Sequence, residues 1–331
     1  MLRRIDPMVR LLVAAMLLAA LLPVSGAAVG IAQLVANAAV FVLFLLNGLR
    51  LPRAEVLAGL GNHRLLIPLV LWSYGAMALA GWALWQAGAL SPGGVGLLPP
   101  LLGLGFLFLG VLPSTVQSAT AYSSLAGGNV ASSVVAAALL NLLGVFVTAP
   151  LFSLLAGSAQ PGFDAIENTG AALIKVVAIL LVPFVLGQLL QRWLGGWIVA
   201  HRPLVTVMDR SSIAIAVYVA FSGAVAGGIA SRIDAAGWAG LLVAVALLLV
   251  FAHGGAWLLG KALRLPRGDR IAMLFAGGQK SIAMGAPLAT VLFAPEVAGI
   301  VLLPILTYHL LQLVLAAPLA EKLNKSQPRS P

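Results

Sequence analysis

The sequence predicts an all-α polytopic membrane protein, with ten transmembrane helices in two five-helix repeats of opposite topology. Three observations support this fold class. Hydrophobic residues make up 61% of the 331 residues and charged residues only 8%, whereas a soluble domain carries about 25% charged residues. Apolar segments of roughly 17 to 29 residues recur along the chain, and about 20 residues cross a hydrocarbon core. Basic residues collect between alternate segments, as in cytoplasmic loops.

The apolar segments give the expected helices in chain order. We expect them at residues 8–24, 27–49, 65–84, 97–125, 130–155, 170–190, 211–229, 236–259, 271–293 and 297–319. The first segment follows Arg3 and Arg4 and also has the pattern of a cleavable signal peptide. It is long enough to span a bilayer, and the two-repeat organisation requires it as the first helix.

The charge distribution predicts that both termini are cytoplasmic. With the N-terminus inside, 16 of the 19 lysines and arginines lie in cytoplasmic segments, and the other three are Lys175, Arg232 and Lys280. The outside loops instead hold Asp164, Glu167, Asp234 and Glu296. The loops are too short for a soluble catalytic domain, so we expect residues 1–331 to form one transmembrane domain.

The two halves of the chain show weak internal similarity, with repeat one at about 8–155 and repeat two at about 170–319. Gln117-Ser118 in the fourth span matches Gln279-Lys280-Ser281 in the ninth, and each half later reaches Ala-Pro-Leu, at 149–151 and 317–319. Both matched spans contain helix breakers. Pro113 interrupts the fourth span, and Gly277-Gly278 interrupts the ninth. Matched interrupted spans indicate a transporter binding site, although kinked helices packed through small residues would give a similar pattern.

Lys280 is the most informative residue, because it lies inside an apolar stretch. A charge at that depth costs on the order of 3 kcal/mol and usually marks a substrate or ion pathway. The central parts of the spans contain no Asp or Glu that could pair with it. Desolvation disfavours its charged form, so the amine could be neutral, carry a proton during transport, or meet an anionic substrate. Alternatively, it could snorkel or bond to backbone carbonyls at the C-terminus of a half-helix.

Other polar residues near the two interruptions are weaker candidates. Neutral side chains that could line the crossing, or form helix–helix hydrogen bonds instead, are Thr115, Gln117, Ser118, Thr120, Gln279 and Ser281. Asn129 could contact a ligand or close the loop after the fourth span. His309 could relay protons or pack as a neutral ring. His253 is expected to be structural, and Asn141 receives no role.

At these residues the chain resembles the bile acid:sodium symporter superfamily, in particular its bacterial symporters and its vertebrate member-7 branch. The segments that carry the resemblance are 46–49 (Leu-Asn-Gly-Leu), 112–118, 127–129 (Gly-Gly-Asn), 278–287 and 308–313. The resemblance implies a core domain and a panel domain, with the fourth and ninth helices unwound and crossing in the core.

The resemblance also implies a sodium site, and the chain departs from it at one position. Members similar to this chain carry a glutamate-x-glycine-x-glutamine-asparagine run. When this run is aligned with residues 275–280, Phe275 stands at the position of the glutamate and Gln279 at that of the glutamine. Lys280 then stands at the asparagine. In the first repeat Ser118 lies near one ligand position, Ser133 matches another, and Ala137 occupies a threonine position. A sodium site on Ser118, Ser133 and Gln279 would lack its carboxylate, which weakens the case for sodium coupling.

Together these patterns predict a secondary transporter that moves a small organic anion across a bacterial inner membrane by alternating access, coupled to Na⁺ or H⁺. The alternatives are a channel and a non-transporting membrane regulator. An enzyme is disfavoured, because the four histidines are far apart and the chain has no cysteine and no HExxH motif. No cofactor is expected. Dispersed basic residues argue against nucleic-acid binding, and no Gly-rich phosphate loop suggests ATP-driven transport.

Overall fold

The structure is a computed structural model that describes residues 7–50, 61–89, 98–157, 177–228 and 233–325. Within these residues every regular element is helical and no strand occurs, which confirms the all-α prediction. Seven described helical segments are long and apolar enough to cross a membrane, if the continuous run His63–Gly88 is taken as one segment, and a bent pair would make eight. Helices suit this environment because they satisfy all backbone hydrogen bonds within one segment.

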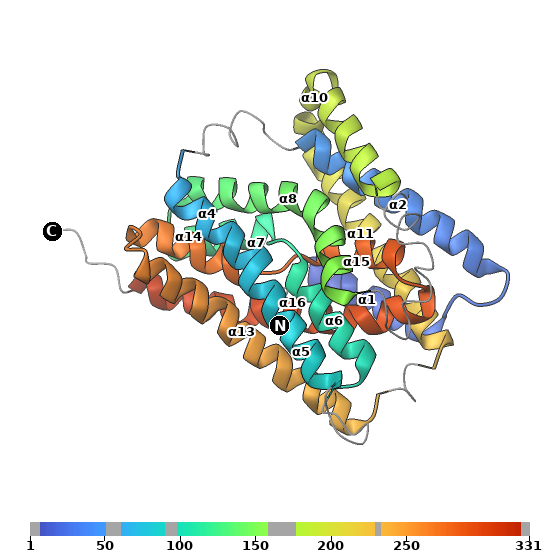
Figure 1. The fold of residues 1–331 in the computed structure, drawn as a ribbon. Helices are drawn as coiled ribbons and strands as arrows, with labels where there is room; N and C mark the ends of the chain where they lie inside the picture. Colours follow the sequence, from blue (N-terminus) through green and yellow to red (C-terminus); the bar gives the residue numbers. More distant parts are fainter. Residues whose placement is uncertain (1–6, 51–60, 90–97, 158–176, 229–232, 326–331) are drawn as a thin grey trace. The chain divides into compact units, whose positions relative to one another are not determined.

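The helices follow one another along the chain as shown in Figure 1. They are α1 (Pro7–Leu21), α2 (Ala28–Arg50), α4 (His63–Leu71), α5 (Met77–Ala89), α6 (Pro100–Val111), α7 (Val116–Leu125), α8 (Val130–Ala156), α10 (Val182–Ala200), α11 (Arg202–Ala226), α13 (Ala235–Ala262), α14 (Arg267–Gly278), α15 (Ile282–Leu292) and α16 (Pro295–Lys325). Two π-helical turns, η2 (Trp72–Ala76) and η5 (Val177–Leu181), precede α5 and α10.

The count of ten spans stays a prediction. α1 has 15 residues, and α14 and α15 have 12 and 11, so none of the three is long enough alone. α6 and α7 are long and apolar enough to cross a membrane only when the two are taken together as one bent span.

The predicted boundaries of the sixth and seventh spans were wrong on their inner sides. We expected helix ends at residues 190 and 211, but α10 continues to Ala200 and α11 begins at Arg202. The charged residues of this segment lower its hydropathy, yet arginine is a good helix former. The helices therefore extend beyond the apolar stretches and meet at His201.

The described helices belong to two compact units. Unit 1 comprises Met1–Leu51, Ala156–Ala235 and Ala283–Leu303. In it α2 packs against α10 and α11, and α11 packs against α1 (Figure 1). A small core of Leu46, Leu49, Ile198 and Val205 lies at one end of these helices.

Glycines set the distance between α2 and α10 in unit 1. A Cβ atom at Gly48 would overlap the carbonyl oxygen of Phe184, and one at Gly187 would overlap that of Leu45. Small residues at such a crossing let two backbones approach closely, which is a common way for helices to associate in membranes. This packing explains Gly48 within the Leu-Asn-Gly-Leu segment.

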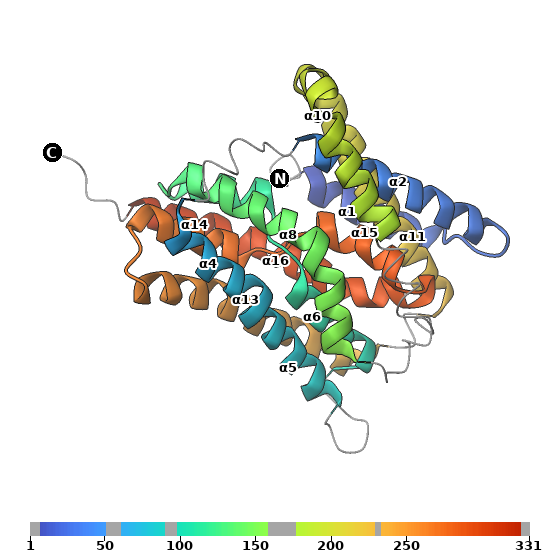
Figure 2. The same ribbon diagram turned by 45° about the horizontal axis from the view of Figure 1, so that its top comes forward.

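Unit 2 comprises Pro52–Leu155, Ala236–Ile282 and Pro304–Pro331. In it α5 packs along α6, and α14 packs against α7 and α4. Figure 2 shows α4, α5 and α13 running together along this unit. Its core includes Leu69, Leu140, Met273 and Phe275, all fully or almost fully buried.

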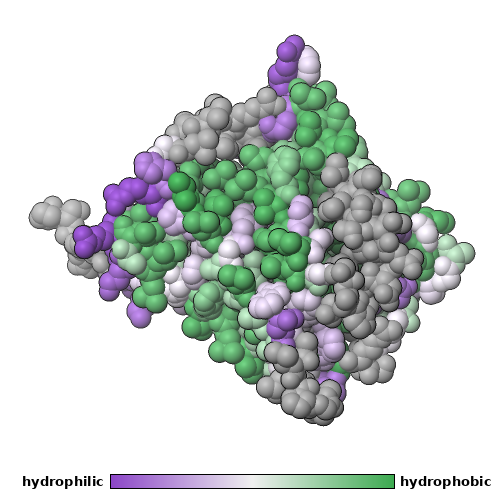
Figure 3. Space-filling view, viewed as in Figure 1, coloured by the Kyte–Doolittle hydropathy of each residue, from purple (hydrophilic) through white to green (hydrophobic). Residues whose placement is uncertain are grey.

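The outer faces of the helices are strongly apolar, as expected for lipid contact. On α13 the side chains of Leu247 and Val250 are 62% and 70% exposed. In Figure 3 apolar residues (green) cover much of the visible surface, whereas hydrophilic residues (purple) gather where α13 and α16 end and α14 begins.

Candidate functional site

The first interruption, which lies in unit 2, separates α6 from α7. α6 ends at Val111, α7 begins at Val116, and the two helices are bent by 65°. Pro113 lies in the extended segment between them, where it removes a backbone donor. The helix ladder therefore stops, and the carbonyl groups around the bend need other donors because no water is present in a hydrocarbon core.

Donors from other segments satisfy five consecutive carbonyl groups at this bend. Lys280 Nζ donates to the carbonyl oxygens of Gly110 and Leu112, at 2.8 and 2.7 Å. Thr148 Oγ1 donates to Val111, at 3.2 Å. The amide N–H of Ser281 donates to Pro113 at 2.9 Å, and Asn141 Nδ2 donates to Ser114 at 2.6 Å. Every carbonyl group from Gly110 to Ser114 therefore has a hydrogen-bond donor.

The second interruption, also in unit 2, separates α14 from α15. α14 ends at Gly278, and α15 begins at Ile282. Side chains of α16 bond to this segment. Tyr308 donates its hydroxyl to the Gly278 carbonyl at 2.5 Å. Gln312 accepts from the Lys280 N–H at 2.8 Å and donates to the Lys280 carbonyl at 3.0 Å.

The same amide of Gln312 connects His309 to this segment. Gln312 Nε2 lies 2.9 Å from His309 Nδ1, and both side chains are buried. His309, one of the weaker candidates from the sequence, therefore lies beside the second interruption. The two interruptions are also joined directly, since Ser281 bonds to Pro113.

The ammonium group of Lys280 is enclosed by backbone carbonyl oxygens. The residue is 1% exposed, and besides Gly110 and Leu112 its Nζ atom donates to the Ser73 carbonyl at 3.2 Å. Ser73 lies in η2, where the regular α-helical ladder is interrupted. Gly110 and Leu112 lie at the C-terminus of α6, the negative end of the helix dipole, which favours a cation. Of the alternatives that the sequence left open, this geometry corresponds to the one in which Lys280 bonds to backbone carbonyls at the C-terminus of a half-helix.

Gln279 connects the two interruptions through its side chain. Its Oε1 atom lies 2.7 Å from Thr115 Oγ1 and 2.5 Å from Ser118 Oγ, and these two hydroxyls also lie within hydrogen-bond distance of each other, so their two hydrogens are shared among three contacts. Its Nε2 atom is buried and has no acceptor among the described residues. The hydroxyls of Ser114 and Thr120 are likewise buried without a partner in the described part of the chain. Three buried polar groups are thus available near the crossing.

The other predicted residues lie in different environments. Gln117 is exposed on α7. Ser133 is fully buried and donates to Ser123 Oγ at 3.0 Å, so no contact described here brings it to Ser118 or Gln279. Phe275, at the position of the expected glutamate, packs against Tyr122 with ring centroids 5.9 Å apart. The three residues of the proposed sodium site therefore divide between two hydrogen-bond clusters.

Asn129 belongs to a separate cluster around the buried carboxylate of Asp269. Asn129 Nδ2 donates to Asp269 Oδ1 at 2.8 Å, and Asn62 Nδ2 donates to Oδ2 at 3.0 Å. The Asn129 N–H also bonds to the Gly268 carbonyl at 3.0 Å. This arrangement attaches the loop after α7 to the first turn of α14, as in the loop-closing alternative.

His253 packs against the second interruption. Its side chain is 4% exposed, Nδ1 lies 3.1 Å from the Leu249 carbonyl, and Nε2 is buried without a partner among the described residues. A Cβ atom on Gly278 would lie 2.7 Å from the His253 ring. The glycine therefore makes room for the imidazole, which fits a structural role.

Sequence reasoning missed several residues that hold the crossing. Asn141, Thr148, Tyr308 and Gln312 each bond to a carbonyl group released by an interruption. All four are polar residues within apolar spans, and that signal was present in the sequence. Their partners lie as many as 37 residues away, so the sequence alone could not pair them.

Comparisons with known proteins give a consistent result. The sequence profile of the SBF-like CPA transporter family matches residues 6–325. An uncharacterized protein of Pseudomonas aeruginosa is 38% identical over 311 residues, which cover 94% of this chain and 90% of that protein. YfeH of Escherichia coli, described as a candidate symporter, is 34% identical over 328 residues, which cover 98% of this chain and 94% of YfeH. The mouse sodium/bile acid cotransporter 7 is 25% identical over 290 residues, which cover 85% of this chain and 80% of that protein.

Proposed function

Because the chain belongs to the SBF-like CPA transporter family, it is a secondary transporter, and we propose that it carries an organic anion by alternating access. Membership makes it a multi-pass membrane protein with a small-molecule substrate rather than an enzyme. The similar bacterial proteins and the basic inner segments support a place in the bacterial inner membrane, with both termini in the cytoplasm. Ten spans in two inverted repeats are part of the same proposal.

The observation that carries the anion assignment is the position of Lys280. Its ammonium lies at the C-terminus of α6 and neutralises the negative end of that half-helix. Four residues separate the end of α6 from the start of α7, and Thr115 provides no side-chain cap for the first N–H groups of α7. The positive end of the second half-helix is thus not balanced by the negative end of the first. Half-helix N-termini of this kind face anionic substrate groups in other transporters.

The unpaired polar groups support the same substrate class. Gln279 Nε2 and the Ser114 hydroxyl are buried donors without an acceptor among the described residues. A buried donor left without a partner costs about 1–3 kcal/mol, and a carboxylate or sulfonate oxygen would supply the acceptor. Lys280 would then act as a fixed positive charge that stabilises the crossing and favours an anion beside it.

The coupling ion is a separate part of the proposal. Gln279, Thr115 and Ser118 provide neutral oxygens, which a hard cation such as Na⁺ accepts as ligands. Among the described residues no carboxylate bonds to these groups, and Phe275 stands at the position where the sequence resemblance leads us to expect a glutamate. We therefore propose that the fixed charge of Lys280 takes over the role of the missing cation, and that coupling is to H⁺ or to weakly bound Na⁺.

Uptake into proteoliposomes tests the substrate class. The purified protein would be supplied with radiolabelled organic anions, including a bile acid, and with a neutral analogue of each, under Na⁺ or H⁺ gradients. Saturable uptake of an anion, and none of its neutral analogue, is expected. Uptake that does not saturate would indicate a channel, and equal uptake of the neutral analogue would contradict the anion assignment.

Thermal unfolding in detergent tests the coupling ion. The unfolding midpoint would be measured in sodium, potassium and choline salts between pH 5.5 and 9, because a ligand that binds the folded state raises stability by mass action. Selective stabilisation by sodium would show that a sodium site remains without its carboxylate. A pH-dependent change that disappears in Lys280→Ala, with no sodium effect, would assign the cation role to lysine.

A further inference from the structure

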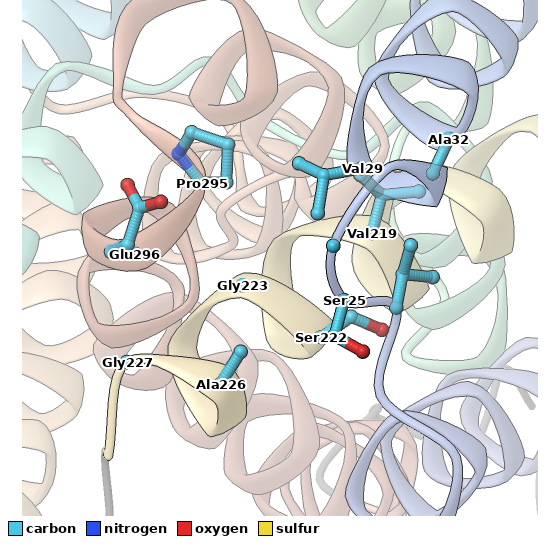
Figure 4. A pocket seen from close by; sticks show the side chains of 12 residues that line it. Ser25, Val29, Ala32, Val219, Ser222, Gly223, Ala226, Gly227, Pro295 and Glu296 are labelled. Atoms are coloured by element: carbon cyan, nitrogen blue, oxygen red, sulfur yellow. The ribbon is translucent and has the colours of Figure 1, made fainter.

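Unit 1 contains a small cavity that is separate from the two interruptions. It lies between the turn that joins α1 to α2, the last two turns of α11, and the first turn of α16 (Figure 4). Its volume is about 180 Å³. A cavity of about 150 Å³ accommodates benzene, so this one has room for a ligand with a six-membered ring and one or two substituents.

The cavity has an apolar body and two polar sides. Most of its lining consists of small aliphatic residues, among them Val29, Ala32 and Val219. Ser25 and Ser222 bring hydroxyl groups to one side, and Glu296 brings a carboxylate to the other (Figure 4). An amphiphilic molecule with polar groups at both ends would match this lining.

Ser222 is the residue that indicates a ligand. It is 1% exposed, and its Oγ atom is buried without a hydrogen-bond partner among the described residues. A buried hydroxyl normally finds a partner, because leaving it unpaired is unfavourable. Ser222 lines the cavity, so a molecule within the cavity could supply that partner.

Glu296 gives the site its charge. It lies in the first turn of α16, where a carboxylate also favours the helix dipole. That effect explains a glutamate at this helix position but not the unpaired hydroxyl of Ser222. Within the described residues no lysine, arginine or histidine forms an ion pair with Glu296. The carboxylate is exposed and available to a cation from outside the chain.

We propose that this cavity binds a small organic ammonium ion. The ammonium group pairs with Glu296, the hydrocarbon body contacts the aliphatic lining, and a polar group at the other end bonds to Ser222. A bare metal ion fits less well, because the carboxylate and the serine hydroxyls line opposite sides of a cavity much larger than one ion (Figure 4). The site is independent of the substrate proposed for the transporter.

Three probes on one carbon skeleton test the charge requirement. trans-4-Aminocyclohexanol carries an ammonium and a hydroxyl group, cyclohexane-1,4-diol is its neutral counterpart, and 4-hydroxycyclohexanecarboxylate is anionic. The full-length protein in detergent would be titrated with each probe, and the unfolding midpoint and binding heat would be measured. We expect the ammonium probe to bind with a Kd on the order of 1 mM, and the other two to produce no saturable shift.

Variants locate the binding to this cavity. Glu296→Gln should weaken binding about fivefold, as for one exposed ion pair, and Ser222→Ala should also weaken it. Ala32→Leu should abolish it by filling the cavity, and Ala226→Leu serves the same purpose if that variant does not fold. Glu321→Gln, an exposed glutamate on the same helix, is the matched control and should bind as the parent does.

Two results would overturn the proposal. The first is an equal shift with the neutral diol, which would remove the charge requirement. The second is unchanged binding of the ammonium probe both in Glu296→Gln and in the cavity-filling variant. That result would place the binding elsewhere. Each variant is compared with its own midpoint in the absence of probe, so a change in basal stability does not affect the result.

Discussion

At the scale of the residue, Lys280 shows how a buried cation is accommodated without a carboxylate. Its ammonium has three hydrogens and three carbonyl acceptors, so every donor is used. Two of these acceptors are at the negative end of α6, where a cation is favoured. The intramembrane charge is therefore part of the helix structure as well as a source of positive potential.

Replacement of Lys280 by methionine should destabilise unit 2. Lys280→Met leaves the carbonyls of Gly110 and Leu112 buried without that donor, and we expect a loss of about 1–3 kcal/mol. The unfolding midpoint in detergent would be compared with that of Lys261→Met, which changes an exposed lysine at the end of α13. Equal midpoints for the two variants would show that the carbonyl contacts do not contribute to stability.

A second residue-scale prediction concerns two tyrosines that each donate to a carbonyl. Tyr308 is fully buried and bonds to Gly278, whereas Tyr218 bonds to Leu22 in an exposed position. Tyr308→Phe should cost about 1–3 kcal/mol because it leaves a buried acceptor unpaired. Tyr218→Phe should cost less, since water can replace its hydroxyl. Unfolding midpoints of the two variants measure the difference, and a reversed order would contradict the assignment of Tyr308.

The residue scale also shows what sequence could and could not predict. Lys280 and Gln279 could be identified because a charge or amide in an apolar run is visible directly. That Lys280 bonds to Gly110 and Leu112 could not, because those residues lie 170 and 168 positions away and only the fold brings them together. Ser133 was assigned to the sodium site by resemblance, which stays a prediction, and its bond to Ser123 could not be predicted because only the fold pairs the two residues.

At the scale of the element, hydropathy found the helices better than their ends. All-helical structure and the long apolar spans follow from composition, since lipid leaves the backbone few alternatives. The end of α10 and the start of α11 did not follow, because helix propensity continues through charged residues that hydropathy treats as loop. Glycine contacts between helices were also not predictable, since they depend on which faces meet.

Replacement of two glycines on α2 by alanine should change the stability differently, with a loss at Gly48 and no loss at Gly30. Gly48→Ala would place a methyl group against the Phe184 carbonyl, and we expect a cost of about 1–3 kcal/mol as the helices separate. Gly30 lies on the same helix with open space around its Cβ position. Gly30→Ala should be neutral or stabilising by up to about 1 kcal/mol. Similar midpoint changes in both variants would argue against a close α2–α10 contact.

At the scale of the whole molecule, each unit has its own helix-packing, ion-pair or hydrogen-bond contacts. Unit 1 contains the α2–α10 crossing and the ion pair between Arg50 and Asp209. Unit 2 contains both interruptions and the groups bonded to them. The division between the units falls after Ile282 and at Pro304, within α16. Substitutions at Lys280 and at Gly48 therefore report on different parts of the molecule.

The cysteine-free sequence allows a direct test of the proposed topology. Single cysteines at Asp234 and Glu296 are expected to react with a membrane-impermeant maleimide in intact spheroplasts, because these residues belong to the proposed outer loops. Cysteines at Arg264 and Lys322 should react only after the membrane is permeabilised. The parent chain provides the zero-label control. Labelling of Lys322→Cys in intact spheroplasts would place the C-terminus outside.

The bonded bend between α6 and α7 also imposes an order on biosynthesis. Residues 110–114 leave the ribosome long before Lys280 and Ser281, which supply donors to three of their five carbonyls. Until the later segment is inserted, those three carbonyl groups lack these donors, and because all three are acceptors they cannot bond to one another. The nascent first half should therefore remain open to proteases and quality control, and a chain that ends at Ala156 should be degraded faster than the complete one.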